Sequence, residues 1–183
     1  VPRIDYTGGG CPHILAEPQR TNLITYSEDL SQGIWVGRGF TKVGVVAGAL
    51  GQNGYEFLEN NSDSNPAIYY NGDTSDGNPR TLGVWLKSSS PITIALATTG
   101  NVKTSDVNVT TDWQFFQCTD SINASQGAHI GGFSTITRGS GVSIYVSMAQ
   151  TENGSYPTSY IPTSGSTVTR NQDIFTRDGI GSL

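Results

Sequence analysis

Hydrophobic side chains recur at every second position along many short runs of this chain. The clearest runs are Thr81 to Lys87, Ile92 to Thr98 and Val142 to Gln150, and they are rich in Val, Ile, Thr and aromatic residues. A two-residue period places alternate side chains on opposite faces of a β-strand, whereas a helix requires a period near 3.6. No stretch keeps the helical period over three turns. The pattern therefore predicts strands and no long helix.

Turn-forming clusters separate these runs at short intervals. They are rich in Asn, Asp, Gly, Pro and Ser, which are the residues that favour tight turns. The clearest clusters are 60–66, 71–79 and 138–141. The remaining strand candidates are 22–26, 35–46, 55–58, 67–70, 107–110, 113–119 and 129–137. Many short strands at this spacing are typical of a sandwich or barrel. The expected fold class is all-β, an antiparallel β-sandwich.

Two of the runs separate into an aliphatic face and a face of small residues. The aliphatic positions are Leu82, Val84 and Leu86 in the first run and Val142, Ile144, Val146 and Met148 in the last. Burying each such side chain stabilises a fold by roughly 1.5–3 kcal/mol, so these positions predict the core. The opposite face carries Gly, Ser and a few large side chains, where a solvent-facing strand would carry more Lys, Glu and Thr. We expect it to be either a shallow binding surface or a surface covered by another chain.

Aromatic side chains supply the candidate ligand-binding residues. Ring faces are apolar enough to stack on the C–H faces of sugar rings. Trp85 and Tyr145 stand among the small residues and are the preferred candidates for carbohydrate binding, with Lys87 beside them. Trp35 and Trp113 are expected to be structural.

No set of residues points to catalysis. Neither His13 nor His129 lies near a nucleophile elbow such as G-x-S-x-G. A glycosidase needs two facing carboxylates, but alternation places Glu56 and Glu59 on opposite faces of their strand. The chain is therefore expected not to be an enzyme.

Charge and cysteine content exclude several further classes. The net charge is −5 and no Lys/Arg cluster is present, which argues against nucleic-acid binding. No apolar run approaches the ~20 residues of a membrane span, so membrane insertion is not expected. Cys11 and Cys118 lie far apart in the sequence, and two free thiols are favoured over a disulfide.

The chain is expected to divide into three parts. Residues 1–21, rich in Pro and Gly, predict an extended arm without a core of its own. Residues 22–163 hold the strand candidates, and 164–183 are expected to form a second arm or a linker to a further domain. The first residue is Val, and the sequence is expected to be a piece of a longer protein.

Several segments resemble known proteins. Residues 22–30 with Gly33 and Trp35, the strand 83–88, and the strand start 111–116 are similar to carbohydrate-binding-module-like jelly rolls of the galactose-binding type. Residues 2–6, 15–23 and 157–163 resemble the lead-in and ending of phage tail-fibre and head-fibre proteins. Ala16 and Ser147-Met148 depart from the pattern, where those proteins usually have a large apolar residue and Trp-Gly.

The resemblance implies a jelly-roll domain on a virion surface, in contact with other virion subunits and most often in a homotrimer. It also implies binding to bacterial surface glycans. The alternative is a carbohydrate-binding module of a larger secreted bacterial protein, and part of a glycan depolymerase ranks third. No cofactor is required, but in related modules a structural calcium often lies between the first and last strands. That position makes Glu28 and Glu152 candidate ligands. Asp73, Asp76 and Asn78 form a second calcium candidate, because carboxylate and amide oxygens suit a hard cation.

Overall fold

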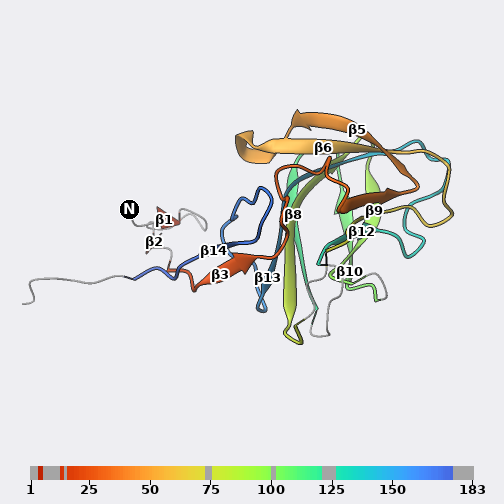
Figure 1. Cartoon of the computed structure of the whole chain (residues 1–183). Helices are drawn as coiled ribbons and strands as arrows, with labels where there is room; N and C mark the ends of the chain where they lie inside the picture. Colours follow the sequence, from red (N-terminus) through yellow and green to blue (C-terminus); the bar gives the residue numbers. More distant parts are fainter. Residues whose placement is uncertain are drawn as a thin grey trace, which may run out of the picture.

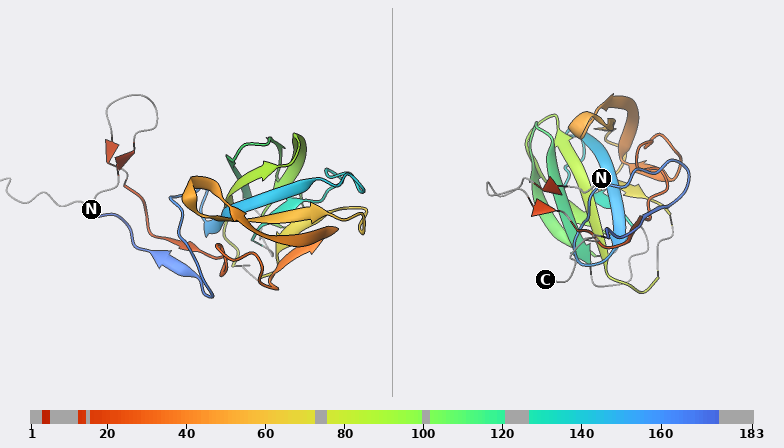
Figure 2. Two further views of the ribbon diagram at one scale, coloured as in Figure 1. Left: turned by 90° about the horizontal axis from the view of Figure 1, so that it is seen from above. Right: turned by 90° about the vertical axis from the view of Figure 1, so that its left-hand side faces the viewer.

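The protein is a two-layered β-sandwich with paired terminal segments at one end (Figure 1). The structure is a computed structural model that describes residues 4–5, 13–14, 16–72, 76–99, 102–120 and 127–174. Cys11 and Asp73 lie outside these residues, as do most of the first 15 residues and the last nine. Figure 2 shows the two sheets stacked on each other and the terminal segments leaving the sandwich together.

One layer, here called the β8 sheet, contains the longest strands. Its order is β11 (Gln114–Asp120), β8 (Arg80–Ser88), β13 (Ser143–Asn153), β6 (Asn53–Glu59) and β5 (Phe40–Ala47). All neighbouring strands in it are antiparallel.

The other layer, here called the β9 sheet, is also antiparallel. Its order is β10 (Ser105–Val109), β9 (Ile92–Ala97), β12 (His129–Gly131), β7 (Ala67–Tyr70) and β4 (Trp35–Arg38). A single 3-10 turn, η1 (Ala49–Gly51), joins β5 to β6. Among the described residues, no helix reaches the length and hydrophobicity that crossing a membrane would need.

The core lies between the inner faces of the two sheets and confirms the all-β sandwich. The predicted aliphatic positions Leu82, Val84 and Leu86 are fully buried, as are Ile144 and Val146. The β9 sheet contributes a matching set, namely Ile68, Ile94, Leu96 and Ile130. Trp35 is also in the core, with its Nε1 donating to the Tyr26 carbonyl at 2.8 Å, so its expected structural role is confirmed.

The strand β13 departs from the predicted alternation at Met148. A β-bulge lies between Ser147 and Gln150, and Met148 has φ of 51°. One extra residue in a strand reverses the side-chain alternation beyond it. Ala149 therefore takes the core position predicted for Met148, which is only partly buried, and that prediction is wrong.

Two other strands are shorter than expected. The run 129–137 is regular only to Gly131, because Gly132, Phe133 and Ser134 have positive φ and turn the chain. In the run 22–26, strand pairing stops at Asn22. Beyond it, the Asn22 side chain accepts hydrogen bonds that a paired strand would otherwise accept. Its Oδ1 accepts the backbone N–H groups of Ile24 and Thr151 at 3.1 and 3.2 Å. This side chain is fully buried and fixes the start of the sandwich to β13.

The terminal segments pair with each other beside the sandwich. The strands β3 (Arg20–Asn22) and β14 (Val168–Arg170) form a two-stranded antiparallel ribbon. Glu17 accepts the Ser159 backbone N–H at 2.7 Å and lies 3.1 Å from the Arg170 guanidinium. Further out, β1 (Ile4–Asp5) pairs with β2 (His13–Ile14).

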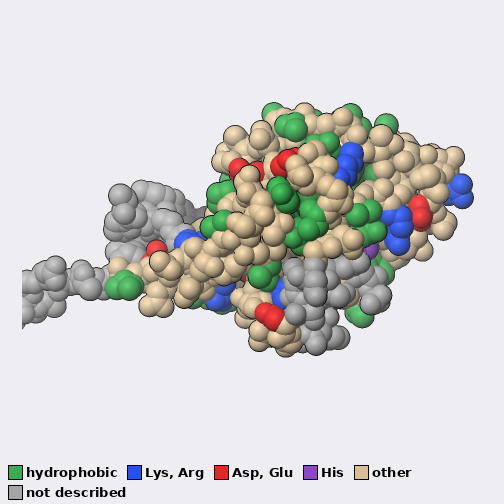
Figure 3. Space-filling model, viewed as in Figure 1, with side chains coloured by type: hydrophobic (Ala, Val, Ile, Leu, Met, Phe, Trp, Pro, Cys, Tyr) green, Lys and Arg blue, Asp and Glu red, His purple; other side chains and the backbone are tan. Residues whose placement is uncertain are grey.

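The surface has few charges, as the 14% of charged residues implies. Figure 3 shows Lys, Arg, Asp and Glu scattered over one face with hydrophobic side chains between them. The Cys118 thiol is free and buried, and burial raises its pKa to about 12.

Candidate functional site

The structure brings the three predicted carbohydrate-binding residues together. Trp85 and Lys87 lie on β8, and Tyr145 is directly opposite Lys87 on the neighbouring strand β13. All three point away from the core, since their neighbours Val84, Leu86 and the aliphatic residues of β13 fill it. Each is partly exposed. The indole of Trp85 therefore lies on the outer surface of the β8 sheet.

Two further aromatic residues join them from the edge strand. Phe115 on β11 is the cross-strand partner of Trp85, with ring centroids 5.8 Å apart, and is 45% exposed. Trp113 precedes β11, and its ring lies 5.2 Å from the Lys87 Nζ. We call this surface the aromatic face. It consists of Trp85, Lys87, Trp113, Phe115 and Tyr145.

The sequence reasoning missed Phe115 and assigned Trp113 a structural role. The signal that would have found both is parity, because positions 113 and 115 share one strand face, whereas the core-facing Phe116 has the opposite parity. What parity cannot give is the cross-strand partner. Only the pairing of Phe115 with Trp85 shows that these rings meet.

Two glycines make room for the rings. A Cβ at Gly83 would lie 3.1 Å from Cζ of Phe115, so the bare backbone allows this ring to lie close to β8. A Cβ at Gly54 would lie 3.1 Å from Cη2 and Cζ2 of Trp113. Gly54 is on β6, and β8 and β13 separate β6 from β11 in the sheet order. Trp113 thus reaches across the aromatic face from its edge.

The ammonium group of Lys87 lies between two ring systems. Its Nζ is 4.8 Å from the centroid of Tyr145 and 5.2 Å from that of Trp113, which is the geometry of a cation–π interaction. Among the described residues Lys87 makes no ion pair. The only cation on the aromatic face is therefore held by rings rather than by a carboxylate.

Other parts of the same outer surface are covered. Ser147, expected to lie on the open face, is fully buried under the turn between β5 and β6. Its Oγ accepts the Ala49 N–H at 3.3 Å and donates to the Asn53 carbonyl at 2.8 Å. Further along β13, Gln150 is buried and its Oε1 accepts the Ile161 N–H at 2.6 Å. At these two positions the outer surface is closed, whereas the aromatic face beside them is open.

Glu152, the candidate calcium ligand on β13, is enclosed by hydrogen-bond donors. Glu152 is fully buried, and its carboxylate accepts hydrogen bonds from the Thr158 backbone N–H, the Thr158 hydroxyl and the Gln150 amide at 2.6–2.9 Å. The Arg20 guanidinium lies 3.5 Å away. A carboxylate surrounded by donors and a cation has no lone pairs directed at a metal, so Glu152 does not fit the predicted calcium.

Glu28 lies near Tyr160 of the C-terminal segment. Burial raises the pKa of Tyr160, and the nearby Glu28 carboxylate raises it further. Among the described residues, no group of three or more His, Cys, Asp or Glu side chains is placed to hold a metal ion.

Two members of the loop candidate for calcium, Asp76 and Asn78, lie in the described part of the chain and are joined by a hydrogen bond. Asp76 lies 2.9 Å from the buried Arg80 guanidinium and accepts hydrogen bonds from the Asn153 amide at 2.6 Å and the Asn78 N–H at 3.1 Å. Burial opposes ionisation, but these bonds outweigh it and hold the pKa of Asp76 below its usual value.

The pair Glu56 and Glu59 lies on opposite faces, as predicted, with Glu59 buried and Glu56 partly exposed.

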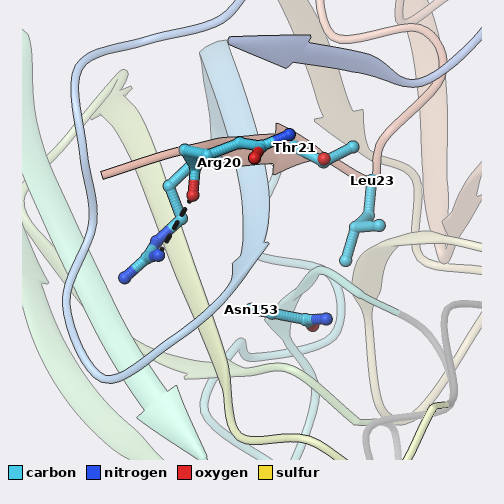
Figure 4. Close-up of a pocket in the computed structure, with 5 residues that line it drawn as sticks. Arg20, Thr21, Leu23 and Asn153 are labelled. Carbon is cyan, nitrogen blue, oxygen red and sulfur yellow. Dashed lines mark hydrogen bonds between the residues drawn. The ribbon is translucent and has the colours of Figure 1, made fainter. Parts of the chain in front are cut away.

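A separate cavity of about 320 Å³ lies where the terminal ribbon joins the sandwich. It is lined by Gln19, Arg20, Thr21, Leu23 and Asn153. Figure 4 shows Arg20, Thr21 and Leu23 following one another along and beyond β3, with Asn153 across from them. None of the predicted site residues lines this cavity.

Comparison with known proteins gives structural likeness only. No family model matches the chain, and no curated protein matches it. Among solved structures, it is similar to the CBM22-1–GH10 modules of Clostridium thermocellum endo-1,4-β-D-xylanase 10B complexed with xylohexaose. The identity is 12% and the TM-score 0.50, over 79% of this chain and 30% of the other. The chain thus spans less than a third of that protein's length.

Two weaker likenesses are to complete binding domains. A carbohydrate binding module of family 29 matches at 10% identity and a TM-score of 0.46, over 75% of this chain and 89% of that one. The N-terminal cellulose-binding domain of Cellulomonas fimi β-1,4-glucanase C matches at 10% identity and a TM-score of 0.45, over 67% and 90%. The fold is that of a carbohydrate-binding-module-like jelly roll, as the sequence predicted.

Proposed function

We propose that this domain binds a carbohydrate chain on the aromatic face. The observation that carries the proposal is the row of partly exposed rings, Phe115, Trp85 and Tyr145, on three adjacent strands of one sheet. Exposed apolar surface of this kind on a soluble domain is typical of a binding site. The fold supports the proposal, because the similar structure contains the CBM22-1 and GH10 modules of a xylanase in complex with xylohexaose.

The chemistry of the face suits a sugar. Each pyranose ring has an apolar C–H surface, which stacks on an aromatic ring, and a rim of hydroxyls that needs hydrogen-bonding partners. Lys87 supplies donors between the rings, and the Glu56 carboxylate supplies an acceptor on the next strand but one. A few well-placed polar groups on an apolar floor are the usual composition of a ligand site.

The test is a glycan array followed by calorimetric titration of the glycans that bind. Trp85→Ala and Phe115→Ala should each weaken binding at least about 10-fold, because a central aromatic anchor typically carries this much of the binding free energy. The matched control is Phe133→Ala, which removes a partly exposed ring beside the β9 sheet and should leave the affinity unchanged. Urea unfolding of each variant checks that it remains folded.

Two results would overturn the proposal. One is the absence of any bound glycan on the array for the folded domain. The other is binding that survives both Trp85→Ala and Phe115→Ala unchanged.

A virion-surface location, contact with other virion subunits, homotrimer formation and attachment to bacterial surface glycans remain predictions from the sequence resemblance. They are compatible with glycan binding on the aromatic face. A non-catalytic module of a larger secreted protein would use the same face in the same way.

A further inference from the structure

We infer that the glycan bound on the aromatic face is acidic, and that Lys87 recognises a carboxylate of a uronic acid unit. This inference deepens the proposed function and depends on it. It rests on the juxtaposition of the Lys87 ammonium with two ring faces and on the lack of a carboxylate paired with it among the described residues.

The position of Lys87 makes it part of the binding floor rather than a freely moving surface charge. It is the cross-strand partner of Tyr145, and its Nζ lies 5.2 and 4.8 Å from the ring centroids of Trp113 and Tyr145. The rings restrict the side chain and replace part of its hydration. A cation that has already lost water and rotamer freedom pays less to bind an anion.

Other lysines of this domain already have partners. Lys103 pairs with Asp106 at 2.8 Å, and Lys42 donates to the carbonyls of Ser31 and Gln32 at 3.1 and 2.8 Å. Lys87 has none of these polar partners in the described part of the chain. Its position at the centre of the aromatic face therefore leaves its N–H donors available to a ligand.

The charge around Lys87 also depends on two carboxylates near the aromatic face. Glu56 lies on the same sheet surface, next to Tyr145, where it accepts the Ser143 hydroxyl at 2.7 Å. Asp112 is exposed and adjoins Trp113. Neither forms an ion pair with Lys87. The positive charge is thus local, and an acidic unit would bind over Lys87 with its hydroxyls toward Glu56.

The chemistry distinguishes an acidic unit from a neutral one. A carboxylate on an ammonium group forms a charge-assisted hydrogen bond, which is stronger than the bond a sugar hydroxyl would form there. An acidic oligosaccharide should therefore bind about 10- to 100-fold more tightly than its neutral ester, which has the same sugar rings.

The test compares oligogalacturonate and oligoglucuronate hexamers with their methyl esters by calorimetric titration. The native domain should prefer the free acids, and the preference should shrink as the salt concentration rises, because ions screen the pair. Lys87→Met should abolish the preference, and Lys87→Arg should restore most of it. Glu56→Gln should strengthen binding of the acids, since it removes a nearby like charge. Lys103→Met, just before β10 of the other sheet, is the matched control and should change nothing.

The outcomes separate the inference from the proposed function. Equal affinity for acid and ester, or an acid preference that survives Lys87→Met, overturns the inference while glycan binding on the face stands. Failure of both acids to bind, with neutral glycans bound on the array, has the same meaning. Failure of every glycan overturns both.

Discussion

The outer surfaces of the two sheets both carry aromatic side chains, but only one of them is open. On the β8 sheet, Phe115 is 45% exposed and Trp85 is partly exposed beside it. On the β9 sheet, Tyr69 stacks on His129 with centroids 5.7 Å apart and an interplanar angle of 11°, and the Phe133 ring is tilted against the same imidazole with centroids 5.4 Å apart. His129 is only 4% exposed.

The difference comes from what the chain does after each strand. At the end of β12, positive φ at Gly131, Gly132 and Phe133 turns the chain, and the Phe133 ring packs against His129. A Cβ at Gly132 would lie only 2.7 Å from Cε1 of His129, so glycine permits this close approach. No turn in the described part of the chain covers Trp85 in this way. An aromatic residue on an outer strand face is therefore a candidate for binding only where the following chain leaves it uncovered.

The largest effect is expected at the covered end of the β8 sheet, in the change Glu152→Ala. It would leave the two Thr158 donors without an acceptor, remove the shortest hydrogen bond of the Gln150 amide and deprive Arg20 of its carboxylate. Removing one partner from such a buried network costs about 3–5 kcal/mol. Urea unfolding measures the change, and Glu56→Ala, with a partly exposed carboxylate, should cost about 1 kcal/mol or less. A loss for Glu152→Ala as small as that of the control would contradict the role given to this carboxylate.

The covered β9 surface should make the fold sensitive to acid. Burial, together with the charge of Arg38, lowers the pKa of His129 to about 4 from a usual value of 6.5. The unfolded chain thus takes up this proton more readily than the folded one, so the stabilisation is complete above pH 6.5 and is lost as pH falls from 6.5 to 4. The shift is worth at most roughly 3 kcal/mol.

Urea unfolding at neutral and acidic pH tests this, with His129→Phe as the reference that cannot titrate. The native chain should lose more unfolding free energy than the variant over that interval. Equal losses would show that His129 is not buried as a neutral imidazole.

Removing the ring that covers the outer surface of the β9 sheet should make this surface as open as the aromatic face. Phe133→Ala removes the ring that packs on His129, which should readmit water and move the pKa of His129 back toward 6.5. The cost in unfolding free energy is expected to be about 1–2 kcal/mol, because Phe133 is only partly buried. NMR titration of the imidazole resonances gives the pKa directly. An unchanged value would mean that other residues provide the cover.

The smallest effect is expected at Gly83 on the open face. In Gly83→Ala the new Cβ would lie 3.1 Å from Cζ of Phe115 and would displace the ring by a few tenths of an ångström. The affinity for a bound glycan should fall several-fold, with a change in unfolding free energy below about 1 kcal/mol. Gly33→Ala is the control, because a Cβ there has no neighbour within 4 Å. Unchanged affinity in Gly83→Ala would show that Phe115 is not part of the binding surface.

Local sequence pattern predicted the layers well and the site in part. Alternation along 81–87 and 142–147 placed Leu82, Ile144 and Trp85 on their correct faces, because side-chain direction in a regular strand depends only on parity. The same rule failed at Met148, since a bulge depends on the partner strand and leaves no local mark.

Local sequence pattern could not predict which strand positions are covered by distant parts of the chain. Ser147 is buried by a turn about 100 residues away in sequence, and Glu152 is enclosed by Arg20 and Thr158. Phe115 and Trp113 joined the site through strand pairing, which likewise connects distant segments. These contacts decide which outer positions remain open, and they appear only when the whole chain is folded.

The three tryptophans provide the most direct test of binding on the aromatic face. In an NMR titration with an oligogalacturonate hexamer and with xylohexaose, the indole N–H resonances report on each ring separately. Trp85 and Trp113 lie on the aromatic face, whereas Trp35 is 1% exposed and donates to the Tyr26 carbonyl. With at least one of the two ligands, the resonances of Trp85 and Trp113 should shift progressively while that of Trp35 stays fixed. Resonances of Trp85 and Trp113 that stay fixed with a ligand that calorimetry shows to be bound would contradict the account.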